Sequence, residues 1–221
     1  MNLIISKQLK EMFVDKAMVF FLIVSILIGG IAAPVIKRDY FMVTVATISF
    51  LLIVQLAPSL FTEEKENKTL ETLLSTPISM KSIYRGKTLF CFLTCGCVLC
   101  LSMIIGVSIS YIQYYEFVYA LLELLMICVL LLLGVYNASK QAVYYSLLSD
   151  DSRSCSLKVI VTTLLYIVLA DVIAVPINID FTNRMILRGI YLVIQLIIGI
   201  VYWIKTRKYM DKAVIFLSFR L

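Results

Sequence analysis

The chain of 221 residues contains no histidine. This excludes membrane metalloproteases and serine proteases that need an imidazole as ligand or base. A phosphate-binding loop of the form G-x4-G-K-[ST] is also missing, so the chain cannot hydrolyse ATP by that route. Charge is scarce: 15% of residues are charged, whereas 62% are hydrophobic. A soluble fold of this size could not bury so much apolar surface, so we expect the chain to lie in a membrane.

Six apolar runs are long enough to cross a bilayer, which takes about 20 residues. The runs cover residues 17–35, 41–61, 88–110, 117–148, 157–175 and 187–204. The fourth is too long for one straight span, so we expect either a kink near Gly134 and Asn137 or an end that projects beyond the lipid. The sequence therefore predicts an all-α integral membrane protein with a single domain over residues 1–221.

Residues 1–16 precede the first run and have an amphipathic pattern. Ile5, Leu9, Met12 and Phe13 recur at helical spacing and share one face. This pattern predicts a helix that lies flat on the membrane surface. The alternative is a cleaved signal peptide with 29-GGIAAP-34 as its cleavage site, but a long amphipathic start is a poor match to such a peptide.

The positions of the basic residues predict the orientation. With the N-terminus placed inside, 16 of the 20 lysines and arginines fall in inner segments and four in outer segments. Basic residues concentrate in the cytoplasmic loops of membrane proteins. We therefore expect both termini and the segment 62–87 to be cytoplasmic. This distribution also makes nucleic acid an improbable partner for the net charge of +6.

Four of the six cysteines form a C-x3-C-x-C-x2-C cluster, which raises the alternative of a metal or iron–sulfur site. On a straight helix, Cys91 and Cys95 point in similar directions, whereas Cys97 and Cys100 point away from them. Their sulfur atoms cannot converge on one ion, so we interpret the cluster as small residues of a packed span and expect no metal.

Residues 62–87 form the most charged stretch of the chain and join the second apolar run to the third. Leu70, Leu73 and Leu74 share one face of a predicted short helix, whereas Glu71 lies on the other face. A simple connecting loop is the alternative. It would explain the lysines, but it explains neither the amphipathic pattern nor a length of about 25 residues.

A proline separates this short helix from the next one. Pro77 ends the helix, because the residue before a proline is disfavoured in the helical conformation. Ser79 can then cap a second helix that runs into the third span. The sequence thus predicts a short helix, a sharp turn and a second helix at the inner surface.

This stretch resembles the signature loop of ABC type-2 exporter permeases. The family pattern is a charged triplet, a Gly-Thr-Leu-Glu core, a leucine pair, a Pro-Ile-Ser turn and a later Gly-Lys. The matching residues are Glu64, Lys65, Glu66, Thr69, Leu70, Glu71, Leu73, Leu74, Pro77, Ile78, Ser79, Gly86 and Lys87. Lys68 departs from the pattern, because the family usually has glycine there, and this departure affects the backbone just before the helix.

The resemblance implies a non-catalytic transport subunit of the cell membrane, with six transmembrane helices, an N-terminal elbow helix and a cytoplasmic coupling helix. Two permease chains, identical or different, would form the translocation path. Two soluble ATPase subunits, which bind ATP and magnesium, would dock below them. The cargo would be a peptide, an antibiotic or another amphipathic molecule. The residues expected to couple to the ATPase are Glu64, Glu66, Thr69, Leu70, Glu71, Leu73, Leu74, Ser75 and Pro77.

Polar residues inside the apolar runs are candidates for the translocation path. Gln55, Glu123 and Asp171 are such residues, and intramembrane polar groups are often functional. The alternative is a hydrogen bond to a neighbouring helix or a position at the membrane interface, and we favour such a bond for Gln195 as well.

The second large inner loop carries Asp150, Asp151 and Arg153. These residues are candidates for a second contact with the ATPase. A solvated turn is the alternative, and the sequence favours neither interpretation over the other.

Two other classes of membrane protein are alternatives to the exporter permease. The first is a six-span subunit that captures the substrate of a small-molecule importer, but such subunits do not carry the leucine helix with its proline break. The second is a glutamate-pair intramembrane protease, which would need that pair within a span and a histidine elsewhere. Glu63 and Glu64 lie at the inner border instead.

Overall fold

A computed structural model describes residues 2–32, 41–69, 79–114, 121–174 and 181–218 of the chain, and these ranges are almost entirely helical. The elements are α1 (Asn2–Val14), α2 (Lys16–Leu27), the π-helical turn η1 (Ile28–Ala32), α4 (Phe41–Glu66), α6 (Met80–Tyr114), α7 (Leu121–Leu148), α8 (Ser152–Ala174) and α9 (Phe181–Ser218). Within the described ranges, five helices are long and apolar enough to cross a membrane, and α1 with α2 makes a sixth if this bent pair counts as one span. The fold is all-α and compatible with a multi-span membrane protein.

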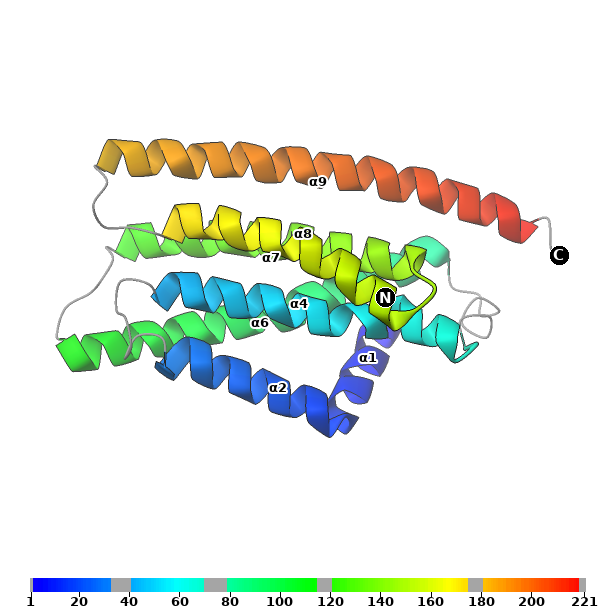
Figure 1. Cartoon of the computed structure of the whole chain (residues 1–221), viewed down its shortest axis with the longest axis horizontal. Coiled ribbons are helices and arrows are strands. Elements are labelled where there is room, and N and C mark those ends of the chain that lie inside the picture. The colour runs from blue at the N-terminus through cyan, green and yellow to red at the C-terminus, as the bar shows by residue number, and fades with distance from the viewer. Residues whose placement is uncertain (1, 33–40, 70–78, 115–120, 175–180, 219–221) are drawn as a thin grey trace.

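The long helices run side by side in alternating directions (Figure 1). α4 packs against α6, α7 and α8, and α9 lies along the outside of α7 and α8. The ends of α4, α7 and α9 and the starts of α6 and α8 gather at one end of the bundle. We call it the basic end, because it carries Lys65, Lys81, Arg85, Lys158 and Arg207.

Small side chains hold α4 at the centre of the bundle. Ala46, Ser49 and Ala57 are fully buried along it. Helices in a membrane associate through close packing, because lipid removes most of the hydrophobic driving force between them, and small residues allow the backbones to approach. Phe50 of α4 stacks on Tyr166 of α8 with ring centroids 5.7 Å apart. α4 is therefore the helix around which the others are arranged.

The described part of the fourth apolar run forms one continuous helix, α7, and the two residues at which a kink was considered both contact α9. Asn137 Nδ2 donates to Gln195 Oε1 at 2.9 Å and to the Gln195 carbonyl oxygen at 2.8 Å. A Cβ atom at Gly134 would lie 2.5 Å from the Tyr191 hydroxyl oxygen, so the glycine makes room for that side chain. The interhelical hydrogen bond predicted for Gln195 is confirmed.

One residue separates the N-terminal helix from the first apolar helix. α1 lies across the basic end and meets α2 at Asp15, with a bend of 84° between the two helices. Val19 N donates to the Asp15 carbonyl oxygen at 3.1 Å, which places Asp15 at the N-cap of α2. Aspartate is among the residues that favour this position, so the abrupt change of direction has a local cause in the sequence.

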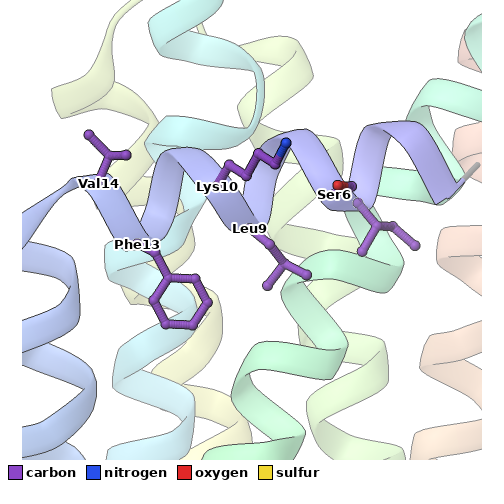
Figure 2. A pocket seen from close by; sticks show the side chains of 6 residues that line it. Ser6, Leu9, Lys10, Phe13 and Val14 are labelled. Atoms are coloured by element: carbon purple, nitrogen blue, oxygen red, sulfur yellow. The ribbon is translucent and has the colours of Figure 1, made fainter.

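The apolar face of α1 divides between the bundle and its surroundings. Met12 is 7% exposed and belongs to the core, whereas Leu9 and Phe13 are 36% and 65% exposed. Figure 2 shows Leu9 and Phe13 pointing to the side along which α2 runs, and Lys10 pointing to the opposite side. This arrangement fits a helix on a membrane surface, with apolar side chains toward the lipid and the ammonium group toward water.

Replacing Gly134 tests the packing of α7 on α9. Gly134→Ala places a methyl group against the Tyr191 hydroxyl, and overpacking of this kind destabilises a protein by about 1–3 kcal/mol. In a Tyr191→Phe background the hydroxyl is absent. The destabilisation caused by the same alanine should therefore be smaller there by at least about 1 kcal/mol. Thermal unfolding of the four purified chains in detergent measures this coupling. An equal loss in both backgrounds would show that the hydroxyl is not the obstacle.

Candidate functional site

The predicted coupling residues belong partly to described helices. Glu64 and Glu66 lie in the last turns of α4, and Thr69 follows them. Outside the described residues lie Leu70, Glu71, Leu73, Leu74, Ser75 and Pro77. The structure therefore describes the two attachments of this segment, which are the end of α4 and the start of α6.

Ser79 caps the start of α6. Its hydroxyl oxygen accepts a hydrogen bond from Ser82 N at 3.3 Å, and its carbonyl oxygen accepts one from Ile83 N at 3.1 Å. These bonds confirm the predicted cap. α6 then continues without interruption for 35 residues, or about 50 Å, which is longer than the hydrocarbon core of a bilayer. The coupling segment is thus attached directly to a helix of membrane-spanning length.

Two residues after the end of α4, the backbone has the left-handed conformation that glycine favours, although the residue at this position is a lysine. Lys68 is left-handed, with a φ of 56°. Thr69 N donates to the Glu64 carbonyl oxygen at 2.9 Å, and Lys68 N donates to that of Lys65 at 3.0 Å. These two bonds define a Schellman motif, which usually has glycine at the left-handed residue. The departure of Lys68 from the type-2 exporter pattern therefore leaves the turn in place.

The buried ammonium group of Lys87 joins α6 to α4. The Lys87 side chain is 1% exposed, and its Nζ lies 2.5 Å from Glu64 Oε2. Nζ also donates to the carbonyl oxygen of Leu60 and lies 4.1 Å from the centroid of the Phe61 ring. Removing one partner of a buried ion pair leaves the other charge uncompensated, which costs about 3–5 kcal/mol. This pair therefore fixes the position of α6 against α4.

The next two residues of the charged triplet bind α7 and α8. Lys65 Nζ donates to the carbonyl oxygens of Leu147 and Ser149, the second at 2.9 Å, where α7 ends. The Glu66 carboxylate accepts from Ser152 N at 2.7 Å and from Ser152 Oγ at 2.8 Å, where α8 begins. A cation at a helix C-terminus and an anion at a helix N-terminus both complement the helix dipole.

Three consecutive charges thus attach the end of α4 to three different helices. We call the set of Glu64, Lys65, Glu66 and Lys87 the charged clamp. The sequence predicted Glu64 and Glu66 as ATPase contacts, and in the structure both carboxylates bind groups of this chain. Glu64 is mostly buried, whereas Glu66 is exposed. The clamp thus joins the start of segment 62–87 to α6, α7 and α8.

A buried hydroxyl group extends these contacts one turn earlier along α4. Ser146 Oγ accepts hydrogen bonds from Phe61 N at 2.9 Å and from Thr62 N at 3.1 Å. Pro58 lies inside α4, and a proline in a helix removes a backbone hydrogen bond and disturbs its neighbours. Ser146 therefore supplies an acceptor from α7 to the backbone just after this disturbance.

An acidic pocket of about 390 Å³ lies beside the clamp, between α1 and the end of α4. Its lining includes the carboxylates of Glu11, Asp15, Glu63 and Glu64. Within the described part of the chain, no group of three histidine, cysteine, aspartate or glutamate side chains is arranged to hold a metal ion. Such a lining favours a basic partner group over an acidic one.

The four clustered cysteines lie on different sides of one helix. All belong to α6, where Cys91 and Cys95 are buried and Cys97 is exposed. The helical geometry assumed from the sequence is therefore the observed one.

The three candidates for the translocation path have different environments. Glu123 of α7 pairs with Arg188 of α9, with Oε1 and Nη2 3.0 Å apart, so the alternative of a bond to a neighbouring helix is confirmed for this residue. Arg188 is itself buried where α9 contacts α7. Gln55 is exposed in the middle of α4. Asp171 belongs to α8, and its side chain lies outside the described residues.

The second inner loop is exposed. Asp150, Asp151 and Arg153 are all accessible at the turn between α7 and α8. The Asp151 carbonyl oxygen accepts from Cys155 N at 3.1 Å and so begins α8. Exposure fits both a solvated turn and a surface available to a partner.

Sequence reasoning missed the internal partners of the clamp, because no local signal shows which helix ends are adjacent. The signs of Lys65 and Glu66 match the ends of α7 and α8 that they bind, and this was the only hint in the sequence. Comparison of the chain with protein-family models and with curated protein sequences gave no match. Function is therefore argued from the geometry and from the sequence pattern.

The charged clamp predicts strong coupling between Lys87 and Glu64. Lys87→Met should destabilise the protein by about 3–5 kcal/mol, because it leaves a buried carboxylate unpaired. In the double variant with Glu64→Gln, the loss of stability should be clearly smaller than the sum of the losses in the two single variants. Thermal unfolding in detergent measures these effects, and Lys208→Met, at an exposed lysine, is the matched control. Additive losses would contradict the buried pair.

The left-handed turn predicts that Lys68→Gly stabilises the protein. Glycine removes a conformational cost of about 1–2 kcal/mol at this φ. Lys68→Ala removes the same charge but keeps the Cβ atom, so it should give no gain. The difference between the two unfolding midpoints isolates the backbone contribution, and equal midpoints would argue against the left-handed conformation.

Proposed function

We propose that this chain is the transmembrane permease subunit of an ATP-driven exporter of the ABC type-2 class. In this proposal the chain has six spans in the cell membrane, with α1 as the elbow helix and both termini in the cytoplasm. Residues 62–87 contain the coupling helix, and the chain itself catalyses no reaction. ATP and magnesium are bound by two partner ATPase subunits.

The observation that carries the proposal is the charged clamp. A coupling helix transmits force only if its base is rigidly attached to the membrane helices. Glu64, Lys65 and Glu66 contact α6, α7 and α8, and the segment continues into α6 through the Ser79 cap. A displacement of residues 67–79 would therefore move four helices together. Closure of a partner that is driven by ligand binding could be converted in this way into a tilt of the bundle.

The geometry of the sequence pattern gives further support. Its charged triplet and its Gly-Lys are about 20 residues apart in the chain, yet Glu64 and Lys87 form an ion pair. Lys68 takes the conformation that suits the glycine of the pattern. A stretch that served only as a connection would need neither feature.

The path and the second permease chain are assigned to the exposed faces. Gln55 is exposed at mid-helix, where a polar side chain facing lipid would be unfavourable, so we assign it to the path or to the second chain. Asp171 remains a candidate for the path, whereas Glu123 serves the bundle through Arg188. The cargo that we propose is a peptide, an antibiotic or another amphipathic molecule.

The ATPase surface comprises the coupling segment and the exposed inner loop. In the helix predicted from the sequence, Leu70, Leu73 and Leu74 share an apolar face that is either the docking face or the anchor on the membrane side. The surface-exposed Glu66 lies next to this segment. Asp150, Asp151 and Arg153 provide the second contact. Apolar docking with charges at the rim gives both affinity and register.

Co-purification with cross-linking tests this function. Full-length chain carrying Ser75→Cys is solubilised from its native membrane with a bifunctional thiol reagent, and the captured chain is sequenced for a phosphate-binding loop. We expect the cysteine at position 75 to be cross-linked to an ATPase chain. Ser108→Cys is the control, because Ser108 lies toward the other end of α6, and we expect it to capture no ATPase. The cysteines at positions 97, 100 and 128 are replaced by alanine in both chains.

The variant Leu74→Asp tests coupling in the same complex. We expect at least about a tenfold loss of bound ATPase, because a charge would interrupt the apolar face that the sequence predicts for this helix. Val14→Asp is the matched control, since Val14 is exposed at the basic end and lies outside the coupling segment. A chain that binds no ATPase, or one that retains a small molecule when purified alone, would favour the importer subunit instead.

A further inference from the structure

A second pocket at the basic end is strongly cationic. It lies between α6, α7 and α9 and has a volume of about 510 Å³. Its four cations are Lys81, Arg85, Lys140 and Arg207, and none of its described lining residues is acidic. Arg85, Lys140 and Arg207 form no ion pair with any other described residue. The pocket therefore concentrates positive charge that this part of the chain does not neutralise, which attracts an anion.

Aromatic rings hold the cations of this pocket in place. Lys140 Nζ lies 4.3 Å from the centroid of the Tyr136 ring, and Arg207 Cζ lies 5.7 Å from that of Trp203. The Tyr84 hydroxyl donates to the Lys140 carbonyl oxygen at 3.0 Å and joins α6 to α7. Tryptophan and tyrosine favour the interface between lipid and water. The pocket thus combines cations with the two aromatic residue types that favour the level of lipid head groups.

An apolar groove continues from the cationic pocket toward the middle of the bundle. It lies between α7 and α9, has a volume of about 280 Å³ and shares Tyr136, Lys140 and Trp203 with the pocket. From Lys140 it extends to Leu133, which is about 10 Å along the helix. Gly199 lines it, where a Cβ atom would lie 3.0 Å from Asn137 Oδ1. The cationic pocket thus opens directly into an apolar groove.

We propose that the pocket and groove together bind an anionic phospholipid, with the phosphate among Arg85, Lys140 and Arg207 and one acyl chain in the groove. Basic pockets between membrane helices suit anionic head groups, and guanidinium groups match the geometry of phosphate. A free phosphate would use only the pocket and leave the groove unfilled. The proposal requires that the chain lies in a membrane, but it does not require an ATPase partner.

The single tryptophan of the chain reports on this site. Trp203 lines both the pocket and the groove, and no other tryptophan contributes to the fluorescence. The protein is reconstituted in two kinds of phosphatidylcholine bilayer. One contains a small fraction of brominated phosphatidylglycerol, and the other contains the same fraction of brominated phosphatidylcholine. Bromine on the acyl chains quenches tryptophan fluorescence on contact. We expect the anionic lipid to quench Trp203 at least about tenfold more effectively per mole.

Two triple variants separate a local site from general attraction. Arg85→Gln, Lys140→Gln and Arg207→Gln together should reduce the lipid preference at least about fivefold. The control is Lys16→Gln, Arg153→Gln and Lys208→Gln, which removes the same charge from exposed positions at the same end and should keep the preference. Because the wild-type comparison needs no variant, the test stands even if one variant fails to fold.

Three outcomes would overturn the proposal. Equal quenching by both lipids would show that the pocket does not select charge. Recovery of fluorescence by millimolar inorganic phosphate, but not by sodium chloride at matched ionic strength, would identify a soluble anion as the occupant. Absence of quenching by either lipid in a chain that sizes as a dimer would show that a second copy covers Trp203.

Discussion

The buried ammonium group of Lys87 constrains the whole basic end. An unpaired charge inside a low-dielectric bundle is strongly unfavourable, so Glu64, the Leu60 carbonyl and the Phe61 ring must all stay near it. All three groups belong to consecutive turns of α4. The register of α6 on α4 is therefore fixed, and with it the position of the segment that joins them. Lys65 and Glu66 extend this constraint to α7 and α8.

The bundle uses different contacts for its central helix and its outer helix. α4 is held by small buried residues and a ring stack, which need close approach over a long surface. α9 is held to α7 by polar pairs at two depths, Glu123 with Arg188 and Asn137 with Gln195. Its other side is apolar and exposed, with Val193 and Ile197 more than half accessible. The polar pairs thus orient a helix that has little apolar contact with the rest of the chain.

Several elements of the fold could be predicted from the sequence, because their causes are local. Apolar length predicted the long helices, and Ser79 was identified as a cap from its position after Pro77. The contacts that Gly134 and Asn137 make with α9 were not predicted, because their partners lie about 60 residues away in the chain. The internal role of Glu66 was missed for the same reason. Such contacts depend on which helices are neighbours, and the hydrophobic pattern of one helix does not contain that information.

The elbow at Asp15 has a mechanical consequence for the response of the chain to bilayer thickness. α1 lies across the basic end while α2 runs along the bundle, and a single residue joins them at 84°. A membrane helix adapts to a thinner bilayer by tilting. In the proposed arrangement, with α1 on the membrane surface, α1 could not follow that rotation without lifting Phe13 out of the lipid. The joint must then open or close. Hydrophobic mismatch would therefore be converted at this joint into an angular strain.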